Sequence, residues 1–324
     1  CASHLNWCFD ARGTTGYERR ECAACSSSGN SSFLIWQFNS HMASFSSLLF
    51  WRKRLPKVAV VRLSGVIASE SGPLRRGLNL NQIESQLKRA FTIPSVKAVA
   101  LVINSPGGSP VQSQLIAARI RQLATRYNVP VLAFCEDVAA SGGYWLAAAA
   151  DEVYANSASV IGSIGVISSG FGFPEALKRL GVERRVYTSG LSKSMLDPFS
   201  EEKDTDIAHL KALQSDIHQL FIDYVKSRRG TRLSGADEEL FSGKFWTGTQ
   251  AKTLGLIDGV GLFHEVLENR FGPDVKIITL SQRSSWRSVT ARLGSYLPAG
   301  FAAQLLDDGI AQVEERAHWS RFGL

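Results

Sequence analysis

The stretch that decides the fold is "VKAVALVINSPGGSP", residues 96–110. Residues 96–104 form an almost continuous apolar run, which is typical of a strand covered on both faces of a parallel sheet. A proline and two glycines follow this run, and Pro110 stands where a helix can begin. The stretch therefore predicts a buried strand that passes through a tight turn into a helix, the repeating unit of open α/β sheets.

Strand and helix patterns alternate on both sides of this stretch. Strands are predicted at 58–67, 129–137 and 151–155, and helices at 80–91, 111–127, 174–181 and 203–229. The last of these helices is long and amphipathic, and a mildly amphipathic segment beyond residue 281 predicts a further surface helix. The repeated strand–helix–strand order predicts an α/β fold with mostly parallel pairing, a long helix and a C-terminal helical tail.

The composition is that of a globular protein large enough for a sizeable core. Of the 324 residues, 44% are hydrophobic and 20% are charged. Seven Lys and Arg and three Asp and Glu fall in residues 1–57, so +4 of the net charge of +7 lies there and no basic groove for nucleic acid is expected. We expect an N-terminal extension over 1–57, a catalytic domain over 58–280 and a C-terminal tail over 281–324.

The N-terminal region differs from the rest. Residues 1–41 lack helical or strand periodicity and Met42 opens a stretch like a natural start, so we expect 1–41 to be upstream or disordered sequence. Cys22 and Cys25 are too isolated to predict a metal site, and no metal or cofactor is expected. No segment reaches the ~20 apolar residues of a membrane span. The basic residues 52–54 predict a solvated linker, and contact with an anionic membrane surface is the alternative. We expect a cytoplasmic protein or one at the inner face of the cell membrane.

Two glycine-rich sites follow apolar strands, at the sheet edge where α/β proteins bind ligands. In the first, Gly107 and Gly108 permit positive φ and let peptide N–H groups converge on an anionic oxygen. In the second, "DVAASGGYWLAAAAD" (137–151), Ser141 opens a helix, where free N–H groups favour the oxyanion that a serine nucleophile creates. Taken singly, each site is better explained by packing. The first would be a tight turn between strand and helix, and the second would be an N-cap serine where small residues let two segments pack closely.

A serine nucleophile needs a base. None of the six histidines lies in a glycine-rich turn, and His209 and His218 fall on the predicted long helix, where they look like surface residues. Lys193, in "SGLSKS", lies between serines with apolar neighbours and no adjacent acid. An amine with an ordinary pKa near 10.4 must be desolvated to act as a base near neutral pH, which an apolar pocket would achieve. A lysine in an exposed loop is the alternative.

The occurrence of four motifs together favours a catalytic site over packing alone. "NSPGG", "ASGGYWLAAAAD", "GSIGV" and "SGLSKS" occur in this order, and together they resemble the signal peptide peptidase family of Ser-Lys proteases in its short, single-repeat form. The resemblance covers about residues 58–270 and implies the spiral of βαβ units that this family shares with Clp proteases and crotonases. It implies these site residues: Ser141 as nucleophile, Lys193 as general base, Ser163 as the serine that holds the lysine amine, and an oxyanion hole at Gly107, Gly108 and Gly142.

The function implied is a serine endopeptidase that cleaves signal-peptide remnants or other unfolded, apolar segments. The family's long form takes its serine and lysine from different halves of a tandem chain, so a short chain is expected to complete its site with a neighbour in a homo-oligomeric ring. Three alternatives stay open: a Clp-type Ser-His-Asp protease, an acyl-CoA-binding crotonase relative, and a catalytically silent scaffold. A serine-reactive phosphonate discriminates the last two from an active protease.

Overall fold

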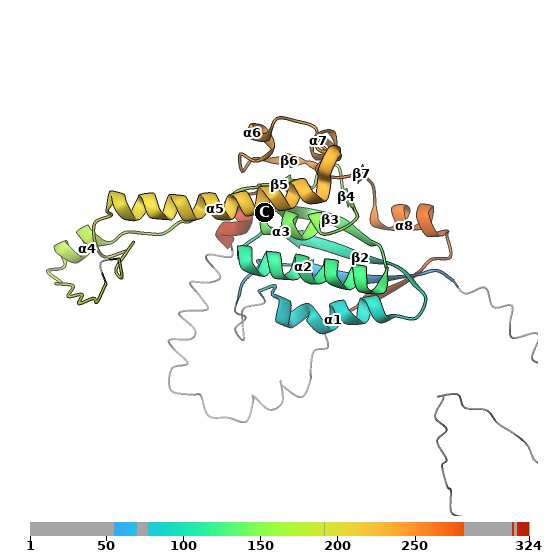
Figure 1. Ribbon diagram of the computed structural model, residues 1–324, viewed down its shortest axis with the longest axis horizontal. Helices are drawn as coiled ribbons and strands as arrows, with labels where there is room; N and C mark the ends of the chain where they lie inside the picture. The colour runs from blue at the N-terminus through green and yellow to red at the C-terminus, as the bar shows by residue number, and fades with distance from the viewer. Residues whose placement is uncertain (1–54, 70–76, 191, 282–312, 314–315, 324) are drawn as a thin grey trace, which may run out of the picture. The chain divides into compact units, whose positions relative to one another are not determined.

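The computed structural model describes residues 55–69, 77–190, 192–281, 313 and 316–323. The interpretations of residues 1–54, including Met42 and the cysteine pair, and of the amphipathic stretch beyond residue 281 up to residue 312 concern residues outside this description. The apolar stretch of the sequence forms β2 (Val96–Ser105), which lies inside an eight-stranded sheet of order β6-β5-β3-β2-β1-β8. In that sheet β4 pairs with β3 and β7, and only the β5–β6 pairing is antiparallel. The predicted α/β fold with mostly parallel pairing is confirmed (Figure 1).

The elements alternate along the chain as the sequence pattern predicts. The remaining strands are β1 (Lys57–Ser64), β3 (Val131–Ala140), β4 (Glu152–Ala155), β5 (Val160–Gly162), β6 (Phe245–Thr247), β7 (Gly259–Val260) and β8 (Lys276–Leu280). The helices are α1 (Leu80–Thr92), α2 (Pro110–Tyr127), α3 (Gly142–Ala148), α4 (Pro174–Arg179), α5 (Asp204–Arg229), α6 (Asp237–Leu240), α7 (Gly248–Thr253) and α8 (Phe263–Phe271). The long helix predicted at 203–229 is α5.

Side-chain caps fix where the first two helices begin. Asn79 precedes α1, and its side chain accepts a hydrogen bond from the Gln82 amide at 3.1 Å. Ser109 does the same for α2 through the Gln112 amide at 3.4 Å, and Pro110 takes the first helical position. A side-chain oxygen here satisfies an amide that has no partner within the helix, so each cap stabilises a helix that begins at the next residue.

The two faces of the sheet are buried against different layers. Helices α1, α2 and α3 cover one face, where side chains such as Leu63, Leu101 and Ile120 are fully buried (Figure 1). The other face packs against α8, with Leu267 among its buried residues. Strand β3 changes partner along its length: its first half pairs with β4 and its last residues pair with β5. This change of partner turns the sheet into the predicted spiral.

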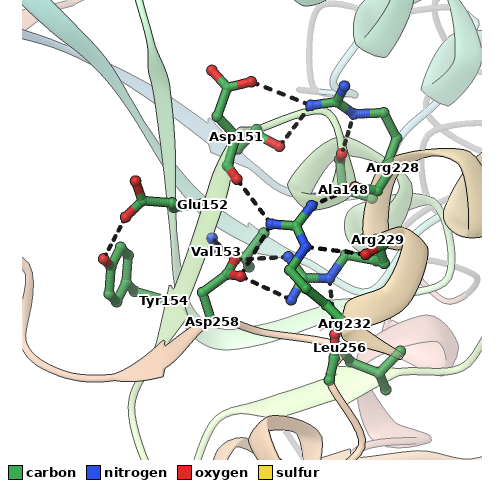
Figure 2. A network of polar contacts seen from close by, with 12 residues as sticks. Ala148, Asp151, Glu152, Val153, Tyr154, Arg228, Arg229, Arg232, Leu256 and Asp258 are labelled. Carbon is green, nitrogen blue, oxygen red and sulfur yellow. Dashed lines mark hydrogen bonds and ion pairs between the residues drawn. The ribbon is translucent and has the colours of Figure 1, made fainter. Parts of the chain in front are cut away.

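A polar cluster ties the C-terminal end of α5 to the rest of the domain (Figure 2). Arg229 is only 2% exposed and donates to both Asp258 oxygens, at 2.7 and 3.2 Å. Asp258 also accepts the Val153 amide of β4 at 2.7 Å. Arg228 donates to the Ala148 carbonyl at the end of α3 at 3.1 Å. We call these residues, with Asp151 and Arg232, the α5 clamp, because they fix α5 to both α3 and β4.

The α5 clamp gives a stability prediction. We expect Asp258→Ala to lower the free energy of unfolding by about 3–5 kcal/mol, because it leaves the buried Arg229 guanidinium without a counter-charge. Urea denaturation at pH 7 measures this. The matched control is Asp237→Ala, which removes an acid from an exposed ion pair with Lys226 and should change stability by less than about 1 kcal/mol.

The same carboxylate should make stability depend on pH. Burial raises the pKa of Asp258, but hydrogen bonds from Arg229 and Val153 outweigh burial and hold it below its ordinary value. Its contribution is therefore present above the unfolded pKa, about 3.9, and is lost as the pH falls through the lower, folded value. The difference between wild type and Asp258→Ala should narrow below about pH 4. A constant difference down to pH 2 would contradict the assignment.

Candidate active site

Ser141 lies at the turn from β3 into α3, in an unusual backbone conformation. Its φ of 50° and ψ of −122° lie in a region that residues with a Cβ rarely adopt. Its amide donates to the Gly162 carbonyl at 2.8 Å, and its carbonyl accepts the Trp145 amide at 3.0 Å. The Ser141 side chain makes no capping hydrogen bond to α3. The backbone is therefore held on both sides, and the hydroxyl does not act as the N-cap that the packing interpretation requires.

The glycine turn after β2 packs directly against this serine. A Cβ on Gly107 would come within 2.8 Å of the Ser141 Cβ, and a Cβ on Gly142 would come within 2.4 Å of the Ser113 Oγ. Both distances are too short for real contacts, so a side chain at Gly107 would displace the serine turn and one at Gly142 would displace the Ser113 hydroxyl. The glycines thus allow close packing, as the packing interpretation expects. That packing brings the turn after β2 against Ser141.

The peptide between Gly107 and Gly108 has a fixed orientation. The Gly107 carbonyl accepts the Ile67 amide at 2.8 Å, and Ile67 in turn accepts the Ser109 amide at 2.7 Å. Gly108 has a φ of 136°, and a Cβ there would lie 2.1 Å from the Ile67 carbonyl oxygen. In a trans peptide the C=O and N–H bonds point in opposite directions, so the Gly108 N–H points away from Ile67.

The three glycines proposed for the oxyanion hole differ in what their amides do. The Gly107 N–H donates to the Ser105 Oγ at 3.2 Å, so it is already engaged. Among the described residues, neither Gly108 nor Gly142 donates its N–H to a backbone or side-chain group. Gly142 is the first residue of α3, where a helix supplies no acceptor. Of these three glycines, Gly108 and Gly142 therefore keep a free donor beside Ser141.

Ser163 lies close to Ser141 through the strand pairing that precedes it. The Gly162 carbonyl that accepts the Ser141 amide belongs to the residue before Ser163. Ser163 is buried, has a φ of 51°, and donates its amide to the Lys244 carbonyl at 2.7 Å. The hydrogen bond from Ser141 to Gly162 therefore links Ser141 to the residue directly before Ser163.

His218 is the residue near this site that the sequence interpretation missed. It was expected at the surface, but it is half-buried and its Nε2 lies 3.1 Å from the Ile164 carbonyl oxygen. That expectation is wrong because α5 lies against the segment after β5, so a polar position of the helix meets a carbonyl there. No helical periodicity marks such a position, because the contact depends on a segment more than fifty residues earlier in the chain.

Lys193 is not brought to Ser141 within one chain. It is exposed, in the segment between α4 and α5, whose Leu196 amide donates to Asp206 at the start of α5 at 3.4 Å. Helix α5 contacts α3 at its other end, where Phe221 stacks on an α3 tryptophan at 4.4 Å between ring centroids. At 1.5 Å per residue, Asp206 and Phe221 are roughly 22 Å apart along the helix.

The segment that carries Lys193 exposes many apolar side chains. We call residues 166–203 the arm, and the described part of its helix α4 has no buried residue. Phe171 is 83% exposed and Tyr187 is 90% exposed. The other exposed large apolar side chains of the arm are Ile167, Phe173, Leu180, Val182, Val186, Leu196 and Phe199. Apolar patches of this extent mark surfaces that bind another protein or a membrane.

Three further observations on the described residues concern a thiol, metal ligands and membrane crossing. Cys135 is a buried thiol, and burial raises its pKa to about 12, so it stays protonated at neutral pH. The described ranges contain no group of three or more His, Cys, Asp or Glu placed to hold a metal ion. They also contain no helix with the length and hydropathy needed to cross a membrane.

Comparison with known proteins reveals relatives with two kinds of name. The chain is 49% identical over 276 residues to a protein of Brucella abortus named Na(+)/H(+) antiporter NhaA. The aligned region makes up 83% of this chain but only 37% of that protein. It is 31% identical over 210 residues to the chloroplastic serine protease SPPA of Arabidopsis thaliana, and this aligned region makes up 63% of the chain and 30% of the relative. The chain thus spans about a third of the length of these relatives.

The family assignment rests on two further matches. A Synechocystis sp. protein, named there as a candidate protease, is 32% identical over 207 residues that make up 63% of this chain and 70% of the relative. The model of peptidase family S49 matches residues 124–270, the segment that contains Ser141, Ser163 and Lys193. Since one relative is covered over most of its length and the family match includes the strained serine turn, the chain belongs to peptidase family S49, the signal peptide peptidase-like family.

Proposed function

We propose that this protein is a serine endopeptidase in which Ser141 attacks the scissile carbonyl. The observation that carries the proposal is the strained Ser141 turn, packed against Gly107 and flanked by the free amides of Gly108 and Gly142. Strained residues persist where the surrounding structure holds them, and they cluster at active sites. The name of the Arabidopsis relative, a serine protease, agrees with this choice of nucleophile.

The proposed reaction is acyl transfer through a covalent intermediate. The Ser141 Oγ bonds to the carbonyl carbon, its proton passes to a base, and the carbonyl oxygen becomes an oxyanion held by the Gly108 and Gly142 N–H groups. The base then gives the proton to the leaving amine as the C–N bond breaks, and water later hydrolyses the acyl-enzyme. Donors that are fixed before the reaction stabilise the developing charge without having to reorganise.

The proposed base is Lys193 of a neighbouring copy. Within one chain Lys193 is at the far end of α5 from the helix contacts beside Ser141, and it lies on an arm with many exposed apolar groups. Packing of that arm against a second copy would desolvate the amine, which lowers the pKa of a lysine. In a closed ring, every copy can receive Lys193 from one neighbour and supply its own Lys193 to the other. In this proposal Ser163 accepts a hydrogen bond from the incoming amine and orients it.

The proposed substrates are unfolded, apolar segments such as signal-peptide remnants. The expected location, in the cytoplasm or at the inner face of the cell membrane, stays a prediction. The antiporter name carries no activity to this chain, because most of the length of the Brucella protein lies outside the match. An acyl-CoA-binding or silent relative would keep the fold without reacting at Ser141. Phosphonylation of Ser141 therefore separates the proposed protease from both.

The pH dependence of the reaction identifies the base. We expect peptide hydrolysis and phosphonate labelling of Ser141 to rise with pH and stay high into the alkaline range, because the base is a neutral amine. Lys193→Ala should abolish this activity. Ser163→Ala should shift the profile, because it removes a proposed partner of the amine.

His218→Gln is the discriminating variant, because His218 is the histidine beside Ser163. Under the proposal it keeps the wild-type pH midpoint. A wild-type pH dependence that disappears in His218→Gln would instead assign the base to the histidine. Wild-type protein that is not labelled at any pH would favour the silent relative.

A further inference from the structure

Ser105 is a buried polar residue that the proposed reaction does not use. It is the last residue of β2 and is 0% exposed. Its Oγ accepts the Gly107 N–H at 3.2 Å. Its carbonyl oxygen lies under the first turn of α3, where a Cβ on Gly143 would come within 2.4 Å of it. One serine therefore contacts both the glycine turn and the helix that follows Ser141.

The hydrogen bond from Gly107 to Ser105 holds the Pro106–Gly107 peptide, which directly precedes the peptide that carries the Gly108 N–H. The amide of Gly107 is fixed by the Ser105 Oγ, and the Gly107 carbonyl is fixed by the Ile67 amide at 2.8 Å. With both ends of the residue held, the Gly108 N–H can only point away from Ile67. Because Gly107 and Gly108 are conformationally permissive, a turn without the Ser105 acceptor has other orientations available to it.

We propose that Ser105 is a positioning residue that orients the Gly108 N–H toward the oxyanion. This inference rests on the proposed function and deepens it. The hydroxyl contacts no reacting atom in this proposal, and it acts by holding the Gly107 peptide. Preorganised donors are worth most when they are fixed before charge develops, so a looser Gly108 amide should slow the chemical step more than it weakens substrate binding.

Three variants of the full-length protein test the role of Ser105. Ser105→Ala removes the acceptor, and Ser105→Cys keeps nearly the same volume but offers only a weak acceptor. The matched control is Ser159→Ala, because Ser159 is 2% exposed and its Oγ also accepts a backbone amide, that of Asn156 at 3.0 Å, but at the turn before β5. Thermal melts ensure that all proteins are assayed well below their unfolding temperatures.

The expected result is a split between kcat and KM. Both Ser105 variants should lose about 10- to 100-fold in kcat, less than the ~100- to 1,000-fold cost of deleting an oxyanion donor, with KM within about threefold of wild type. The rate of phosphonylation at Ser141 should fall in parallel, and the pH midpoint should not move. Ser159→Ala should keep the wild-type kcat.

Other outcomes overturn the proposal. A Ser105→Ala protein with kcat within about twofold of wild type would show that the hydroxyl is not needed to orient the turn. Equal losses in Ser105→Ala and Ser159→Ala, or a Ser105→Cys protein that regains full kcat, would assign Ser105 to packing. If wild type is not phosphonylated at Ser141, or Ser141→Ala keeps its activity, the proposed function fails and takes this inference with it.

Discussion

Ser141→Ala is expected to lower the peptidase rate by about four orders of magnitude or more while leaving the domain folded. The loss is large because the variant has no nucleophile, so no acyl-enzyme forms. The fold should survive because the backbone at residue 141 is held by the Gly162 and Trp145 hydrogen bonds, which alanine retains. Hydrolysis of a fluorogenic peptide and thermal melts on the same sample measure both effects.

Ser141→Gly sharpens this test. It too should be inactive, but its folded state should be more stable than that of Ser141→Ala by about 1 kcal/mol, because glycine adopts a φ of 50° without a Cβ penalty. The control is Ser157→Ala, which alters an exposed hydroxyl and should change neither activity nor stability. Near-normal hydrolysis by Ser141→Ala would remove this residue from the mechanism.

A mixture of two inactive variants is expected to recover activity. Ser141→Ala supplies an intact Lys193, and Lys193→Ala supplies an intact Ser141. If the dyad spans two copies, random exchange in a closed ring gives complete sites at about a quarter of the positions. The expected rate is therefore up to about a quarter of wild type, against a background several orders of magnitude lower.

Subunit exchange must be shown independently for this experiment to decide the matter. Native mass spectrometry of isotope-labelled partners detects mixed assemblies directly. Mixed assemblies that stay inactive would show that serine and base come from one chain, and the base would then be sought among groups near Ser163, His218 first. Unmixed variants, incubated alone under the same conditions, should remain inactive.

Local patterns predicted the elements that carry the serine and the turns around it. The apolar runs at 58–67, 96–104 and 129–137 match β1, β2 and β3 to within a few residues, because a strand buried on both faces needs a continuous apolar sequence. The caps Asn79 and Ser109 use short-range hydrogen bonds, and such bonds leave a signal in the sequence.

Contacts between distant segments could not be predicted in this way. Strand β8 pairs with β1 although more than two hundred residues separate them, and β6 has three residues, too few to show alternation. The α5 clamp joins Arg229 to Asp258, which also accepts the Val153 amide, and nothing local in the sequence marks this acid as a partner. The position of Lys193 at the far end of α5 likewise follows from where that helix packs, which its sequence alone does not specify.

If Lys193 completes the site of a neighbouring copy as proposed, the α5 clamp also affects how accurately that amine is positioned. Helix α5 has 26 residues and is therefore about 39 Å long, fixed at its C-terminal end and extending toward the arm at the other. A tilt of about 5° at the fixed end moves the free end by about 3 Å, which is more than a hydrogen bond tolerates. Because the helix is long and held at one end, a small rotation there gives a large displacement at the other. Under the proposed exchange, the ion pairs of the α5 clamp would then limit how precisely Lys193 is placed in the active site of a neighbouring copy.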